Sequence, residues 1–427
     1  MAAIALTFSV GATACSSSSA NPGSGAGAGD SFTYWSMWKV GEPQQKVIAT
    51  AIADYQKQTG AKVSVQWQGR SNMKKLVPAL NTNTVPDLVD GSYLSGEQTL
   101  AGTDQALGLK DAYAQTIDGT TVSKLIPQKY TDAVDIKLSD GQPWMVPYQI
   151  QSDAIWYNGA KYPDLAKNPP KTWDEFMAEL NKVKAAGVAP IAADGDIAGY
   201  NSAWLTTLIV RTGGPGAFKK LAADKTGQAW KQPAALDAAK KVEQLAKGSY
   251  FIKGYQASKF PFQQQQWAVN KAAFIYMGSW LPTESGSYAA PGFDYKSFPF
   301  PTTGDGDSMR VDFSGFMVPK KAKNADAAQK FAAFFLNKTY QDDWATKAKR
   351  IPVRADAAST PALAGVQNAI KSATAFRQGN DAEAYPGYDE KVFQPNSDKL
   401  FLGKFTAAQF VDAMANDQAT YWKAQGK

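Results

Sequence analysis

The sequence predicts an α/β fold divided into two or more lobes, and three observations support this. Segments with strand alternation and segments with helical periodicity follow one another between Ser31 and Asp90. A chain with about 400 ordered residues is too long for one ordinary hydrophobic core. Proline- and glycine-rich stretches, such as residues 297–307, read as connectors between later segments.

The first part of the chain shows the alternation most clearly. Residues 32–38, 63–67 and 86–89 have the composition and alternation of strands, whereas apolar residues recur at helical spacing in 47–55 and 73–80. This βαβαβ order starts a largely parallel sheet. Ligands of such sheets bind beyond the carboxyl ends of the strands, so the loops that follow the three strands are candidate binding loops.

Later helices carry start signals. Thr172 to Glu175 and Thr406 to Gln409 match the capping box, in which two side chains satisfy backbone N–H groups at the start of a helix. Asp326 to Gln329 reads in the same way. We therefore predict a helix after each of these three positions.

The N-terminus suggests export. Residues 2–14 form an apolar segment that is too short to span a bilayer, and Cys15 follows it directly. This arrangement resembles the lipobox of bacterial lipoproteins, which implies a signal over residues 1–15 with a lipidated Cys15. Residues 16–30 are rich in Ser, Gly and Ala and predict a flexible tether. The expected location is extracytoplasmic, anchored to the cell membrane by lipid; a buried cysteine in a cytosolic protein is the alternative.

Composition narrows the chemistry. The chain has no histidine and one cysteine, so zinc sites built on those residues, Ser-His-Asp triads and Cys-His nucleophiles are excluded. What remains is carboxylate-only chemistry or no chemistry, and we expect no metal and no cofactor. The net charge of +7 is spread along the chain without a basic arm, which argues against a nucleic-acid partner.

Several passages in order resemble the substrate-binding lipoproteins of bacterial ABC importers for sugars, similar to maltose- and glucose-binding proteins. The central passage covers residues 141–148, 154–158 and 169–176, and later landmarks are residues 272–280 and 313–320. The resemblance implies a two-lobed periplasmic-binding-protein-like fold (type II) with a hinge between the lobes. It further implies a monomeric, non-catalytic receptor that captures a carbohydrate between the lobes and delivers it to ABC transporter permease subunits.

The resemblance also implies where the chain crosses between lobes. Lobe one is expected to hold residues 31–147 and 308–348, and lobe two residues 148–307 and 349–427. Sugars present an apolar face that packs on aromatic rings and hydroxyls that need polar partners. The 12 tryptophans and 18 tyrosines supply rings in plenty, although most of them must be core residues.

Candidate ligand-binding residues come from the two lines of reasoning together. The loops after the first three strands supply four of them, and the family's cleft positions supply the rest. For Trp204 and Trp280 the alternative is a core position, and for Asp90 and Ser92 it is a turn. For Lys349 and Arg350 the alternative is a solvated surface position. The candidates are Trp38, Arg70, Asp90, Ser92, Gln149, Gln151, Trp204, Trp280, Lys349 and Arg350.

Two other functions stay open at this point. A surface-anchored glycoside hydrolase needs only two carboxylates and no histidine, although no acidic pair stands out here. The same fold can also bind a polyol or a glycerol phosphate. Related glucose-binding proteins often carry a histidine near the first crossing, and its absence here leaves the particular sugar open.

Overall fold

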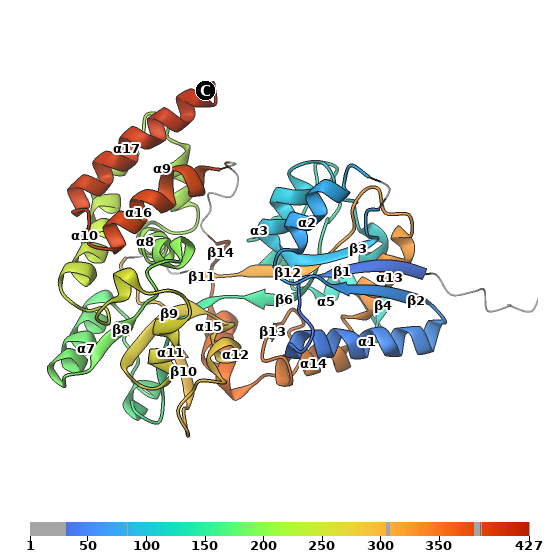
Figure 1. Ribbon diagram of the computed structural model, residues 1–427, viewed down its shortest axis with the longest axis horizontal. Helices are drawn as coiled ribbons and strands as arrows, with labels where there is room; N and C mark the ends of the chain where they lie inside the picture. The colour runs from blue at the N-terminus through green and yellow to red at the C-terminus, as the bar shows by residue number, and fades with distance from the viewer. Residues whose placement is uncertain (1–30, 83, 305–307, 380–384, 386, 427) are drawn as a thin grey trace, which may run out of the picture.

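The computed structural model describes residues 31–82, 84–304, 308–379, 385 and 387–426. It shows two lobes side by side, each built on its own sheet and joined by crossing segments (Figure 1). The two-lobed α/β fold predicted from the sequence is confirmed. The predicted signal 1–15 with Cys15 and the predicted tether 16–30 lie outside the described residues.

Lobe one is built on a six-stranded sheet in the order β13-β6-β12-β3-β1-β2. β1 runs parallel to β2 and β3, as the βαβαβ prediction requires, whereas β12 runs antiparallel to β3 and β6. The strands are β1 (Ser31–Ser36), β2 (Lys62–Trp67), β3 (Leu88–Ser92), β6 (Val146–Gln151), β12 (Asp312–Met317) and β13 (Ile351–Pro352).

The helices of lobe one cover both sides of this sheet, with α1 and α14 drawn below it in Figure 1 and α2 and α3 above. A small hairpin, β4 (Thr116–Ile117) with β5 (Thr120–Thr121), lies among them. The helices are α1 (Pro43–Thr59), α2 (Asn72–Ala79), α3 (Tyr93–Gly96), α4 (Lys110–Ala114), α5 (Val122–Leu125), α6 (Gln128–Thr131), α13 (Ala325–Phe334) and α14 (Lys338–Thr346), with the π-helical turn η1 (Glu97–Ala101).

Lobe two is built on a four-stranded sheet in the order β10-β7-β9-β8, in which only β8 and β9 pair in parallel. Its strands are β7 (Asp153–Asn158), β8 (Ala189–Ala192), β9 (Ala272–Gly278) and β10 (Tyr295–Phe298). Its helices are α7 (Trp173–Ala185), α8 (Ala198–Gly213), α9 (Ala217–Ala223), α10 (Pro233–Lys247), α11 (Phe262–Ala268), α12 (Leu281–Ser285), α15 (Ala364–Ser372), α16 (Gln394–Phe401) and α17 (Ala407–Ala424), with short turns η2 (Pro163–Ala166), η3 (Gln228–Lys231), η4 (Tyr255–Ala257), η5 (Pro361–Leu363) and η6 (Asp389–Phe393).

Two hydrophobic clusters fill the molecule. The larger cluster occupies lobe one and continues into lobe two through Trp156, Ile275 and Met277. The second cluster contains Ile155, Phe274 and Tyr276. Because side chains alternate along a strand, the two sets occupy opposite faces of the same strands β7 and β9. One face of the lobe-two sheet therefore packs toward the larger core, and the other packs into a core of its own.

The structure moves two of the expected lobe boundaries. β6 stays in the lobe-one sheet up to Gln151, because it pairs with β12 along its length, so the first crossing comes at Ser152 and not at 147. β13 also pairs with β6, so lobe one continues past the expected boundary at 348. At the middle crossing, β11 (Met309–Arg310) pairs with β14 (Phe376–Arg377), which brings two crossing segments side by side.

Arg310 connects these crossing segments through ion pairs. Its guanidinium lies 2.9 Å from Asp153 on β7 and 2.9 Å from Asp312 on β12, so one half-buried cation binds carboxylates from both lobes. Burial alone would lower the pKa of Arg310, but the two carboxylates outweigh burial and raise it. The group therefore stays charged, and the ion pairs fix the strands from which the lobes diverge.

Two of the three predicted helix caps are confirmed. The Thr172 hydroxyl accepts a hydrogen bond from Glu175 N, while the Glu175 carboxylate accepts one from Thr172 N. Thr406 and Gln409 make the same reciprocal pair at the start of α17.

The third predicted cap, at Asp326, is wrong. Helix α13 already begins at Ala325, and the carboxylate that accepts hydrogen bonds from backbone N–H groups at its start belongs to Asp87. Asp87 also accepts hydrogen bonds from Thr33. A residue distant in sequence satisfies this helix terminus, so the local pattern was misleading.

Candidate functional site in the interlobe cleft

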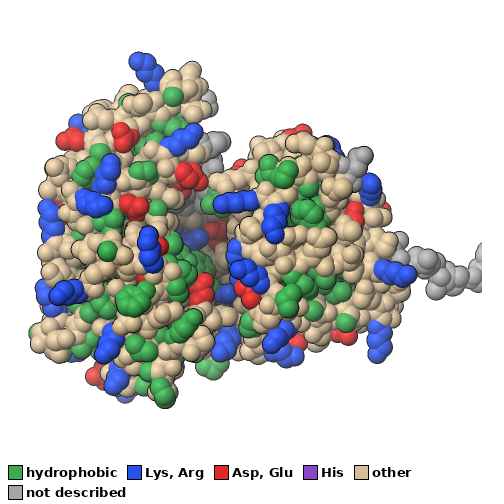
Figure 2. Space-filling model, in the orientation of Figure 1, with side chains coloured by type: hydrophobic (Ala, Val, Ile, Leu, Met, Phe, Trp, Pro, Cys, Tyr) green, Lys and Arg blue, Asp and Glu red, His purple; other side chains and the backbone are tan. Residues whose placement is uncertain are grey.

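Figure 2 shows a hollow between the two lobes. A cavity of about 170 Å³ lies between them, with Leu94 on the side of lobe one and Ser202 and Thr206 of α8 on the side of lobe two. Asp153 and Arg310 of the crossings complete its wall. Hydroxyl groups of lobe two and charged groups of the crossings therefore meet here, opposite Leu94 of lobe one.

Trp280 and Tyr200 form an aromatic pair on the side of lobe two. Trp280 follows β9 directly and is half-buried, and its ring lies nearly parallel to that of Tyr200, with centroids 6.3 Å apart and planes at 28°. Gly278 makes room for this ring, because a Cβ there would lie 2.2 Å from two carbons of the Trp280 ring. The sequence predicted Trp280 as a site residue but missed Tyr200, whose only signal was its place at the start of a helix after a loop.

Trp38 is not an open stacking surface. The side chain is 2% exposed, and its Nε1 donates a hydrogen bond to the Tyr148 hydroxyl at 3.1 Å. The guanidinium carbon of Arg70 lies 4.3 Å from the ring centroid, and that of Arg350 lies 5.6 Å away. Two cations therefore lie over the ring where a sugar would have to pack.

Arg70 is committed to local contacts. It forms an ion pair with Glu42 at 3.0 Å and donates to the backbone oxygen of Met37 at 2.6 Å. These bonds hold the loop that follows β1. Both terminal nitrogens of Arg70 therefore already donate hydrogen bonds within lobe one.

Asp90 and Ser92 also have structural partners. Asp90 is fully buried and accepts hydrogen bonds from Met37 N at 2.7 Å and from the Tyr148 hydroxyl at 2.9 Å. Ser92 caps the short helix α3 by accepting from Ser95 N. Burial raises the pKa of Asp90 to about 6, although the bonds from Met37 and Tyr148 oppose the increase.

Asp90 should make stability depend on pH. Because its folded pKa exceeds the ordinary value of 3.8, its contribution to the free energy of unfolding should fall between about pH 4 and pH 6. The loss should reach about 3 kcal/mol by pH 7. Urea denaturation of wild type and Asp90→Asn at pH 4 and pH 7 measures it, and wild type should gain relative to the variant at pH 4. If the difference in free energy of unfolding between wild type and Asp90→Asn does not change with pH, the raised pKa of Asp90 is contradicted.

The other predicted positions divide into core and cleft. Gln149 is buried, where it donates to Ser314 Oγ and accepts from Trp344 Nε1, both at 3.1 Å. Trp204 is 2% exposed and packs edge-on against Tyr276 in the core of lobe two. These two are therefore structural in this conformation.

Three predicted residues remain near the crossings. Gln151 is half-buried at the end of β6, beside the first crossing. Lys349 is exposed and has a positive φ of 50°, whereas its neighbour Arg350 is buried over Trp38. The structure thus brings Trp38, Arg70 and Arg350 together around one ring, and it places Trp204 elsewhere.

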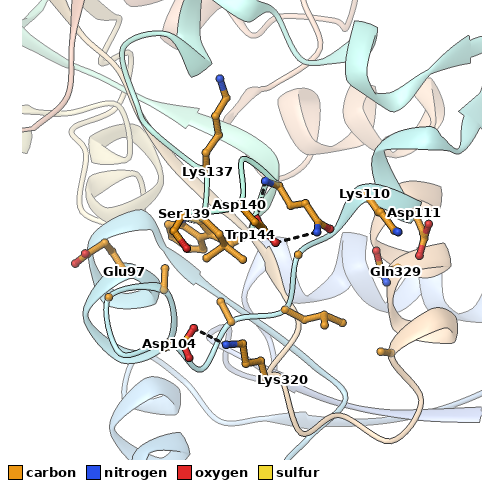
Figure 3. A pocket seen from close by; sticks show the side chains of 18 of the residues that line it. Glu97, Asp104, Lys110, Asp111, Lys137, Ser139, Asp140, Trp144, Lys320 and Gln329 are labelled. Carbon is orange, nitrogen blue, oxygen red and sulfur yellow. Dashed lines mark hydrogen bonds and ion pairs between the residues drawn. The ribbon is translucent and has the colours of Figure 1, made fainter.

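A larger cavity, of about 1000 Å³, lies on lobe one alone (Figure 3). Three of its charged side chains have partners within the cavity, since Lys320 pairs with Asp104 and Gln142 donates to Asp140. All of its lining residues come from lobe one, so closure of the two lobes would not complete a site there. We therefore place the functional site in the interlobe cleft.

We also searched the described residues for a metal site and for a membrane-spanning helix. Within residues 31–426, apart from the undescribed gaps, no three Asp, Glu, His or Cys side chains gather in a way that could hold a metal ion. No helix among the described residues combines the length and apolar character needed to cross a membrane.

The chain is similar to known solute-binding proteins. Residues 41–342 match the family described as bacterial extracellular solute-binding protein. The chain is 26% identical over 337 residues to a probable sugar-binding periplasmic protein of Mesorhizobium japonicum, covering 75% of this chain and 76% of that one. It is 24% identical over 258 residues to the diacetylchitobiose binding protein NgcE of Streptomyces coelicolor, covering 58% of this chain and 54% of that one.

A solved structure described as a chitin oligosaccharide binding protein superposes on the chain with a TM-score of 0.75 at 21% sequence identity. The superposition covers 93% of this chain and 100% of that one. This likeness shows that the two proteins share their fold.

Proposed function

The chain belongs to the family of bacterial extracellular solute-binding proteins, and on that premise we propose that it is the carbohydrate-binding component of an ABC transporter. The observation that carries the proposal is the pair of nearly parallel rings, Trp280 and Tyr200, beside a cavity between the lobes that hydroxyl and charged groups line. A pyranose packs its C–H face on such rings, while its hydroxyls reach polar side chains.

Capture depends on the two lobes. A ligand that contacts both lobes stabilises the closed state more than the open one, because only closure completes all of its contacts. The crossings at Ser152 and around Arg310 are the natural pivots, since each passes from one sheet to the other. The closed complex then delivers the carbohydrate to the permease subunits in the membrane.

We further propose that the protein is a monomer held outside the cytoplasm by a lipid on Cys15. The apolar segment before Cys15 and the Ser/Gly-rich stretch after it support this arrangement. The anchor would keep the receptor close to the permease while leaving both lobes free to bend.

We expect no catalytic step. A carboxylate-only glycoside hydrolase needs two carboxyl groups free to act on the glycosidic bond. Asp153, which lines the interlobe cavity, is ion-paired with Arg310, and so is Asp312 on β12. The relatives named above are described as binding proteins.

The test is thermal unfolding of the purified protein with monosaccharides, disaccharides, chitin and other oligosaccharides, polyols and glycerol phosphate. A ligand at a hundredfold excess over its Kd stabilises the folded state by about 2.7 kcal/mol, which raises the midpoint by several degrees. A shift confined to one class of saccharide supports the proposal. A shift with glycerol phosphate or a polyol alone, or the release of reducing sugar from an oligosaccharide, would replace it.

A further inference from the structure

Arg350 and Glu284 approach each other from different lobes. Arg350 precedes β13, which pairs with β6 in the sheet of lobe one, whereas Glu284 lies on α12, directly after the central strand of lobe two. Their chain neighbours touch, because the Thr283 hydroxyl lies 3.4 Å from the backbone oxygen of Lys349. Figure 1 shows α12 close to β13.

Arg350 is buried, and no hydrogen bond from its guanidinium is found within the described part of the chain. The side chain is 8% exposed, and its Nε is enclosed and unbonded. Its contact with an aromatic ring is the one over Trp38, and among the described residues it forms no ion pair. Burial lowers the pKa of Arg350 to about 10, while the charge of Glu284 opposes this shift. A buried cation with an unbonded donor is costly, so a ligand group that accepts a hydrogen bond from Arg350 would stabilise it.

Glu284 supplies a carboxylate that can accept a further hydrogen bond. Its side chain is exposed to water, yet the protein around it raises its pKa, and the charge of Arg350 works against that increase. Its hydrogen bond within the protein is a long one from Gln264 Nε2 at 3.5 Å. The carboxylate also raises the pKa of Tyr200, so it lies within electrostatic reach of the aromatic pair.

The second cation over Trp38 already has an anionic partner. Arg70, the other cation over Trp38, is already paired with Glu42. Arg350 therefore offers hydrogen-bond donors and Glu284 offers a carboxylate in the same part of the cleft. Such a site suits a group that both accepts and donates a hydrogen bond, which is the property of a hydroxyl.

We propose that Arg350 and Glu284 form a donor–acceptor pair for one hydroxyl edge of the ligand, with Arg350 donating to the hydroxyl oxygen and the hydroxyl donating to Glu284. This inference rests on the proposed carbohydrate function and narrows it. The ligand is a neutral saccharide whose free hydroxyls lie beside the ring that packs on Trp280 and Tyr200. A sugar acid binds more weakly, because its carboxylate meets Glu284.

Calorimetric titration of the full-length protein tests the pair, with maltose, raffinose and N,N′-diacetylchitobiose as probes. Arg350→Met and Glu284→Gln should each weaken binding of the saccharide that binds wild type by about 10- to 100-fold. The double variant should bind about as weakly as the weaker single variant, because both residues serve the same hydroxyl. Glu179→Gln, on the outer helix α7, is the matched control and should bind like wild type.

The unliganded variants supply a second readout. Arg350→Met should keep or increase the thermal midpoint, because an apolar side chain replaces an unpartnered buried cation. If both single variants bind like wild type, the inference is wrong and the proposed function stands. If wild type binds none of the probes and no other saccharide, both fail. If both variants change the small-angle scattering of the unliganded protein and weaken every saccharide by one factor, the pair is a direct interlobe lock and the hydroxyl role is wrong.

Discussion

Replacing Arg310 with methionine should lower the free energy of unfolding by about 3–5 kcal/mol, the largest stability change that we expect from one side chain in the crossings. The reason is the pair of carboxylates it would leave behind, since Asp153 and Asp312 each lie 2.9 Å from its guanidinium. Both are largely shielded from water, with side chains 10% and 9% exposed. Urea denaturation followed by circular dichroism measures the change.

Lys231→Met is the control for this experiment. Lys231 pairs with Asp412 at 2.8 Å, but both side chains are open to water, so the loss should stay below about 1 kcal/mol. Adding Asp153→Asn and Asp312→Asn to Arg310→Met should recover part of the stability, because no uncompensated charge then remains. An Arg310→Met variant as stable as the Lys231 control would show that the crossings do not depend on these ion pairs.

Replacing Trp280 with alanine should weaken saccharide binding by about 10- to 100-fold, or about 1.4–2.8 kcal/mol. The ring is half-buried at the cleft and nearly parallel to Tyr200, so its loss removes packing surface for the sugar. Calorimetric titration with the saccharide that shifts the unfolding midpoint measures the effect.

Trp204→Phe provides the contrast. Trp204 lies in the core of lobe two, so this variant should lose stability but keep its affinity for the saccharide. Wild-type affinity in Trp280→Ala, with the saccharide still bound, would remove Trp280 from the site.

Much of the fold could be predicted because its signals are local. Apolar periodicity in residues 47–55 and 73–80 and strand alternation in 63–67 depend on near neighbours, and the structure contains α1, α2 and β2 at these places. The crossings were harder to locate, because β6 and β13 belong to lobe one through pairing with each other and with β12. Such pairings join segments far apart in the sequence and leave no local signal.

The site shows the same limit. The sequence predicted that Trp38 follows the first strand, which is correct, whereas Asp90 was predicted on a loop and lies inside β3. It did not show that Tyr148 would bond to both of them or that Arg70 and Arg350 would lie over the Trp38 ring. Exposure depends on partners that arrive from other parts of the chain, so the candidate list mixed supporting residues with open ones.

The most direct test of the central claim is a crystal structure of the protein with the saccharide that raises its unfolding midpoint. We predict that the sugar lies between the lobes, packed on Trp280 and Tyr200, with groups from both lobes on its hydroxyls. A sugar found instead in the lobe-one cavity beside Lys137 and Lys320, with the interlobe cleft unoccupied, would contradict this account.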